Sequence, residues 1–98
     1  MDRRVIWTEL AWRDVESAAA YIAKDSPRYA AALIEAVVIA ARSLSKSPER
    51  GRIVPESKDA SIRELFVKRY RLIYAIAPGR VVILAFLHGA RDLHPGGF

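Results

Sequence analysis

Basic side chains are concentrated in the second half of the chain, where they could bind anions or an acidic protein. The candidate binding residues are Arg63, Lys68, Arg69, Arg71 and Arg91. Guanidinium groups bind phosphates and carboxylates through paired hydrogen bonds. If Arg63 and Arg71 point out of the same open sheet face, they lie close together on neighbouring strands. The alternative is a surface network in which the arginines pair with Glu64 and Asp92, and it stays open.

His88 is a second candidate for chemistry, because it follows the last predicted strand and precedes Arg91 by three residues. An imidazole can exchange protons near neutral pH. With a nearby arginine such as Arg91, it could act as a general acid or base in the cleavage of RNA. His88 can equally cap the strand end, since a single histidine specifies no reaction. Tyr70 and Tyr74 could stack on bases, but their alternation along the strand favours positions in the core.

Several classes of function find no support in the residues. The chain has no cysteine, and His88 and His94 have no paired acid at ligand spacing, so neither a metal nor a cofactor is expected. The glycines fit no phosphate-binding loop. No apolar run is long enough to span a membrane, and the N-terminus does not read as a signal peptide. A cytoplasmic protein is therefore expected.

The net charge of +5 is unevenly distributed. Residues 1–40 carry five Lys or Arg and six Asp or Glu, a net of −1, whereas residues 41–98 carry eleven and five, a net of +6. A basic half of this kind favours a polyanion or an acidic protein as partner. Solubility alone is the other interpretation.

The basic residues lie within a predicted three-stranded antiparallel meander. Apolar and polar residues alternate over 62–67 and 70–76, and a nearly continuous apolar run covers 81–87. Pro78-Gly79 predicts the turn of the second hairpin. Lys68 and Arg69 then form the connection of the first hairpin, and the middle strand is expected to be the best protected.

The first half of the chain predicts a short strand and two helices. Residues 3–7 form the strand, and helices follow over 9–24 and 27–46, with Thr8 and Ser26 as their N-caps. The short break between the helices requires an antiparallel hairpin. The polar side of the first helix is expected to carry Arg13, Asp14, Glu16 and Ser17.

A long connection over 47–59 joins the helices to the meander. Pro48, Gly51 and Pro55 oppose any regular element there. The order of elements predicts an α+β fold in which residues 1–98 form one domain and a helical layer covers one face of a mostly antiparallel sheet. The other face is left for water or a partner, and function is expected there.

Five stretches in this order resemble the RelE/ParE superfamily of toxins from type II toxin–antitoxin (plasmid stabilisation) modules. They are AWRDVESAAAYIA at 11–23, SPERGR at 47–52, IREL at 62–65, YRLIY at 70–74 and HGARD at 88–92. The resemblance implies the same α+β fold. It also implies a toxin that a cognate antitoxin neutralises by laying a segment over its surface, so the expected state is a hetero-oligomer.

The resemblance implies two alternative activities. The RelE-like branch cleaves messenger RNA on the ribosome, and Arg71 and Arg91 match arginines of that branch. Arg63 and Leu65, however, stand where that branch has lysines, and no tyrosine follows Tyr74. The HGARD ending is more similar to the ParE-like branch, which binds and poisons DNA gyrase. Gyrase binding is the leading expectation. The alternatives are a ribosome-dependent endoribonuclease, with Arg71, Arg91 and His88 as its candidate catalytic residues, or a non-toxic antitoxin-binding remnant.

Overall fold

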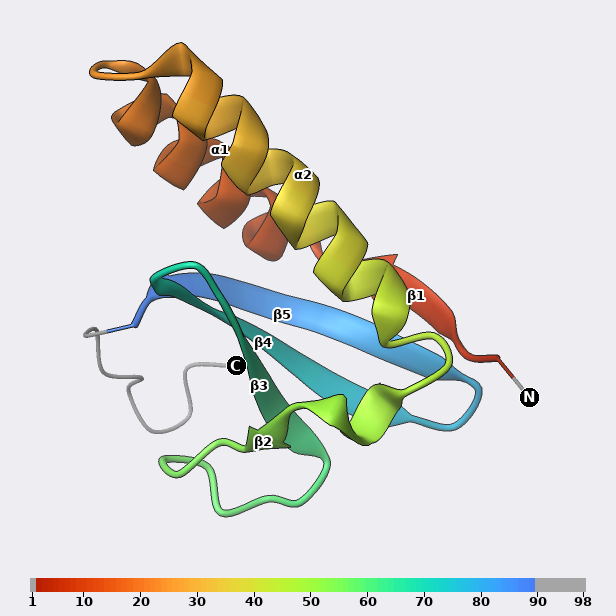
Figure 1. Cartoon of the computed structure of the whole chain (residues 1–98). Helices are drawn as coiled ribbons and strands as arrows, with labels where there is room; N and C mark the ends of the chain where they lie inside the picture. The colour runs from red at the N-terminus through yellow and green to blue at the C-terminus, as the bar shows by residue number, and fades with distance from the viewer. Residues whose placement is uncertain (1, 90–98) are drawn as a thin grey trace.

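A five-stranded sheet forms one layer of the molecule, and a pair of helices crosses one of its faces (Figure 1). The computed structural model describes residues 2–89. Its elements are β1 (Arg4–Trp7), α1 (Glu9–Ala23), α2 (Pro27–Ser43), the 3-10 helix η1 (Pro48–Arg50), β2 (Arg52–Ile53), β3 (Ile62–Val67), β4 (Tyr70–Ala77) and β5 (Arg80–His88). The predicted α+β fold, with its helical hairpin and antiparallel meander, is confirmed.

The strands lie side by side in the order β1-β5-β4-β3-β2. β1 runs parallel to β5, and every other neighbouring pair is antiparallel. Gly79 closes the turn between β4 and β5 at φ 71°, a conformation that L side chains rarely adopt. The residues from Arg71 to Tyr74 are all buried, so the middle strand is protected on both faces, as predicted.

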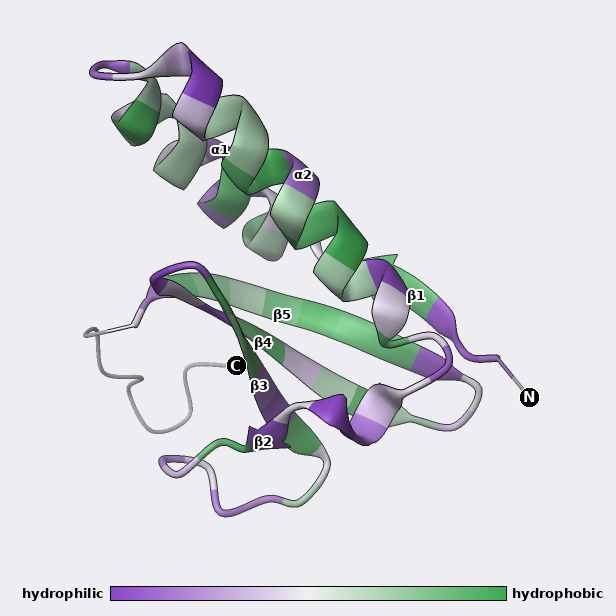
Figure 2. Ribbon diagram, viewed as in Figure 1, coloured by the Kyte–Doolittle hydropathy of each residue, from purple (hydrophilic) through white to green (hydrophobic). Residues whose placement is uncertain are grey.

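The two helices begin at capped N-termini and bury an apolar stripe against the sheet. The Thr8 hydroxyl accepts a hydrogen bond from the Ala11 amide and donates one to the carbonyl of Ile83 on β5, which ties the start of α1 to the sheet. Ser26 caps α2 by accepting from the Tyr29 amide. The buried stripes are Ala11, Val15 and Ala19 on α1, and Ala30, Leu33, Val37 and Ala41 on α2. In Figure 2, hydrophobic bands interrupt the hydrophilic ones along both helices, and most of β5 is hydrophobic.

α2 ends at Ser43, three residues before the predicted end. The amides of Leu44 and Ser45 bond to carbonyls only three residues back, at 3.1 Å each. This tightening of the last turn ends the helix.

The connection over 47–59 contains two short regular elements, so the prediction that none forms there is wrong. Pro48 begins η1, a position that needs no N–H donor, and β2 then pairs with β3. A Cβ on the buried Gly51 would lie only 2.4 Å from the carbonyl oxygen of Glu64. Glycine at this position therefore permits the close approach of β2 to the sheet.

The Tyr74 hydroxyl fixes this segment to the core. It donates to the Pro48 carbonyl at 2.6 Å and accepts from the Gly51 amide at 2.9 Å. Burial raises the pKa of Tyr74, and the hydrogen bond from the Gly51 amide opposes that change in part. The folded protein therefore holds the phenol in its neutral form more strongly than the unfolded chain does.

We predict that Tyr74→Phe lowers the free energy of unfolding by about 1–3 kcal/mol, because it leaves two buried backbone groups without their partner. The contribution of the phenol is fully present below its unfolded pKa near 10 and is lost as pH rises through the folded pKa. The variant should thus lose less stability than the wild type between neutral pH and about pH 11. Urea denaturation at both pH values measures this. The exposed control Tyr29→Phe should change stability by less than about 0.5 kcal/mol, and an equal effect at the two tyrosines would contradict the assignment.

Candidate functional site

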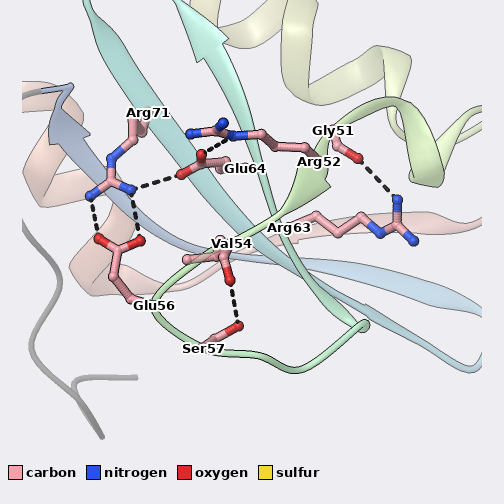
Figure 3. Close-up of polar contacts among 8 residues, drawn as sticks. All are labelled: Gly51, Arg52, Val54, Glu56, Ser57, Arg63, Glu64 and Arg71. Carbon is pink, nitrogen blue, oxygen red and sulfur yellow. Dashed lines mark hydrogen bonds and ion pairs between the residues drawn. The ribbon is translucent and has the colours of Figure 1, made fainter.

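Within residues 2–89, four charged side chains form a cluster on the face of the sheet that the helices leave uncovered (Figure 3). Glu64 of β3 is its centre, and its carboxylate is wholly buried. Arg71 of β4 donates from Nη1 to Glu64 Oε1 at 2.8 Å, and Arg52 of β2 donates from Nε to Glu64 Oε2. One buried acid therefore holds together two arginines from two strands.

Glu56 completes the cluster from outside the sheet. Its two carboxylate oxygens accept from Nη1 and Nη2 of Arg71 at 3.3 and 3.2 Å, side by side, as Figure 3 shows. Burial alone would lower the pKa of Arg71, but hydrogen bonds and the charges of Glu56 and Glu64 outweigh burial and raise that pKa. Arg71 is only 4% exposed. The alternative interpretation of the sequence paired the arginines with Glu64 and Asp92. The structure contains the ion pair between Arg71 and Glu64, and Asp92 lies outside the described residues.

Arg63 and Arg71 do not share a face, so the expectation that they meet across the strands is wrong. Cross-strand partners share a face, and Arg63 pairs with Tyr74 whereas Arg71 pairs with Phe66. Arg63 therefore lies on the helix side with Tyr74, where its Nη1 donates to the Gly51 carbonyl at 3.0 Å. The two-residue turn between β3 and β4 causes the difference, because it pairs odd-numbered residues with even-numbered ones.

A groove opens between the tip of the helical hairpin and the β3–β4 turn. Its volume is about 340 Å³, and a second hollow of about 240 Å³ shares part of its lining. We call it the tyrosine groove and define it by Tyr21, Tyr29, Lys68, Arg69, Tyr70 and His88. Tyr21 and Tyr29 are 70% and 56% exposed, so large aromatic surfaces face solvent beside basic side chains. Sequence analysis identified the two basic turn residues but not the helix tyrosines, which stand on α1 and α2, 39 or more residues away in the chain.

The floor of the groove is an aromatic cluster. The Tyr70 ring stacks on Phe86 at 4.8 Å between centroids and makes an edge contact with His88 at 5.5 Å. Tyr74 is fully buried, as predicted, whereas Tyr70 packs against the core and also lines the groove. Lys68, which forms the lip of the groove, adopts φ 56°.

Asp14 sets the position of this floor. The register of β4 and β5 shifts between Ile73 and Tyr74, which leaves an extra residue in β5. The Phe86 amide beyond this bulge donates to Asp14 Oδ2 at 3.0 Å. The sequence placed Asp14 on the polar side of the first helix, but its carboxylate contacts the sheet at β5. No signal in the sequence reveals this, because the apolar run of β5 does not distinguish its two faces.

The candidate catalytic residues lie on opposite faces of the sheet. His88 is the cross-strand partner of Tyr70 and faces the tyrosine groove with it, whereas Arg71, the next residue along β4, points to the other face. Arg91, the third candidate, lies outside the described residues, as does His94.

Within residues 2–89, no three His, Cys, Asp or Glu side chains gather closely enough to hold a metal ion. None of the described helices has the length and apolar character needed to cross a bilayer.

We predict that Glu64→Gln lowers the free energy of unfolding by about 3–5 kcal/mol, because it removes the charge that balances a buried arginine. The matched control is Glu9→Gln. It breaks an exposed ion pair with Arg13 on α1, and its cost should be below about 1 kcal/mol. Urea denaturation at neutral pH compares the two, and similar losses would show that the buried pair carries no special weight.

Comparisons with known proteins identify the family. The model of the family described as the ParE toxin of the type II toxin–antitoxin system, parDE, matches residues 5–93. Toxin RelE2 of Caulobacter vibrioides is 37% identical over 89 residues, which covers 90% of this chain and 97% of that protein.

Two solved structures share the fold. The chromosomal ParDE toxin–antitoxin system from P. aeruginosa matches with a TM-score of 0.71 at 18% identity, covering 88% of this chain and 95% of that one. The toxin–antitoxin complex RelBE2 from Mycobacterium tuberculosis matches with a TM-score of 0.60 at 31% identity, covering 90% and 99%. With the family match spanning most of the sequence, the chain belongs to the ParE toxin family of type II toxin–antitoxin systems.

Proposed function

We propose that this protein is a toxin that binds and poisons DNA gyrase and is held inactive by a cognate antitoxin. The observation that carries the proposal is the separation of Arg71 and His88 on opposite faces of the sheet. That separation argues against a shared catalytic site for these two residues and favours action by binding. Gyrase acts in the cytoplasm, so the proposal also assigns the protein to that compartment.

The tyrosine groove is the surface that we assign to the target. Tyrosine and arginine are enriched where proteins bind one another, because each buries a large surface and offers polar groups. Tyr21 and Tyr29 provide exposed rings, while Lys68 and Arg69 provide positive charge at the lip. These features suit an acidic protein surface that carries apolar anchors.

An antitoxin is the second proposed partner. Both solved structures named above are described as toxin–antitoxin systems or complexes, which supports a hetero-oligomer for this chain. The net charge of +5 suits an acidic antitoxin segment. If the antitoxin covers the tyrosine groove, neutralisation follows from competition for one surface.

We predict that purified, antitoxin-free protein inhibits supercoiling of plasmid DNA by gyrase. The double charge reversal Lys68→Glu with Arg69→Glu should weaken inhibition by about tenfold or more, because it opposes an acidic target at the groove. The single reversal Arg80→Glu, at the exposed turn between β4 and β5 near the opposite end of β4, should change it little. Lack of inhibition by folded wild-type protein would exclude gyrase poisoning.

The second candidate function is ribosome-dependent cleavage of messenger RNA. The 37% identity to a protein named Toxin RelE2 favours it. On the gyrase proposal, the protein leaves transcripts intact in a translating extract. Cleavage that is lost in His88→Ala would instead establish the nuclease. Expression without antitoxin that fails to slow growth would identify a non-toxic antitoxin-binding remnant.

A further inference from the structure

Among the residues that the structure describes, two acids contact Arg71, and they are held very differently. Glu64 belongs to a regular strand, is wholly buried and accepts from Arg71 at 2.8 Å, within the usual range of about 2.7–2.9 Å for such bonds. Glu56 lies between strands, its side chain is 26% exposed, and its two bonds measure 3.2 and 3.3 Å. Of the two contacts, the one to Glu56 is the looser.

Glu56 is presented by a compact turn over residues 54–61, which we call the strap. Val54 anchors one end, because its side chain is buried and its amide donates to the Ile62 carbonyl at 3.1 Å. The Ser57 hydroxyl donates to the Val54 carbonyl, as Figure 3 shows, and Asp59 accepts from the Ser61 amide. These bonds hold the strap together internally, so it can keep its own shape when Glu56 leaves Arg71.

We propose that Arg71 is a binding site for a carboxylate of an acidic protein partner, and that Glu56 occupies this site in the free protein. The two terminal nitrogens of Arg71 hold the two oxygens of Glu56 side by side, which is the geometry for a planar carboxylate. Glu64 keeps the guanidinium in place while the partner's carboxylate replaces that of Glu56. The inference does not depend on gyrase as the target.

The surroundings of Arg71 favour a protein over a nucleic acid as the source of the anion. Phe66 is the cross-strand partner of Arg71, so it lies on the same face, and its side chain is 54% exposed. The guanidinium of Arg52 lies over the Phe66 ring at 5.4 Å. An acidic segment with an apolar side chain beside its carboxylate would satisfy both the arginine and this exposed ring.

The masking by Glu56 also makes the site selective. Moving Glu56 away removes one negative charge from the surroundings of Arg71, whose side chain is almost fully buried at 4% exposure. Leaving a buried charge without full compensation is costly. Departure of Glu56 from Arg71 is therefore favourable only when another anion takes its place. Glu56 competes for the site. The apparent affinity for the partner therefore equals the intrinsic affinity multiplied by the fraction of molecules whose site is vacant.

Replacement of Glu56 by alanine tests the proposal through chemical rescue. Acetate has the size of the atoms that the substitution removes, so it should refill the site in Glu56→Ala. We expect acetate to bind this variant about tenfold or more tightly than the wild type, measured by NMR titration of arginine side-chain signals at constant ionic strength. Acetate should also raise the melting temperature of the variant more than chloride does.

The control is Glu49→Ala, which removes an exposed acid on η1 outside the cluster. Its response to acetate should match that of the wild type. Inorganic phosphate forms a second titration arm, and we expect it to bind Glu56→Ala more weakly than acetate. Equal acetate binding by the two alanine variants would overturn the proposal. A preference for phosphate would also overturn it, because it would indicate a nucleic-acid ligand.

Discussion

The ion pair between Glu64 and Arg71 allows the central strand of the sheet to be buried on both of its faces. The helices cover one face of β4, and its other face carries an arginine where a small protein would normally place an apolar or solvent-exposed side chain. A buried guanidinium requires a nearby carboxylate, since an uncompensated charge is expensive away from water. Glu64 meets that requirement from the adjacent strand and also binds Arg52. The same pair contacts β2 through Arg52 and the strap through Glu56.

Periodicity was sufficient to predict the architecture but not the direction in which each arginine points. Alternation over β3 and β4, the Pro-Gly turn and the two helix caps correctly indicate a helical hairpin on a meander. The separate faces of Arg63 and Arg71 follow from the length of the β3–β4 turn, because a two-residue connection fixes which residues are opposite each other. That information is present in the sequence, but it depends on knowing where both strands end.

Other features depend on contacts that no local pattern contains. η1 and β2 form because the Tyr74 hydroxyl bonds to Pro48 and Gly51, 26 and 23 residues away in the chain. The bulge in β5 is similarly hidden, because its sequence is apolar on both faces and the partner of the Phe86 amide beyond the bulge is Asp14, 72 residues away in the chain. Arg91 and the rest of the HGARD motif beyond Gly89 lie outside the described residues.

The left-handed backbone of Lys68 has a consequence for how this surface can change over time. A lysine at φ 56° is strained by roughly 1–2 kcal/mol relative to a residue without a Cβ. Glycine or asparagine would relax the turn, yet either would remove a cation from the lip of the groove. On the proposed function, selection for thermal stability and selection for recognition therefore oppose each other at this position, and a more heat-resistant descendant would have to recover the lost positive charge elsewhere on the same rim.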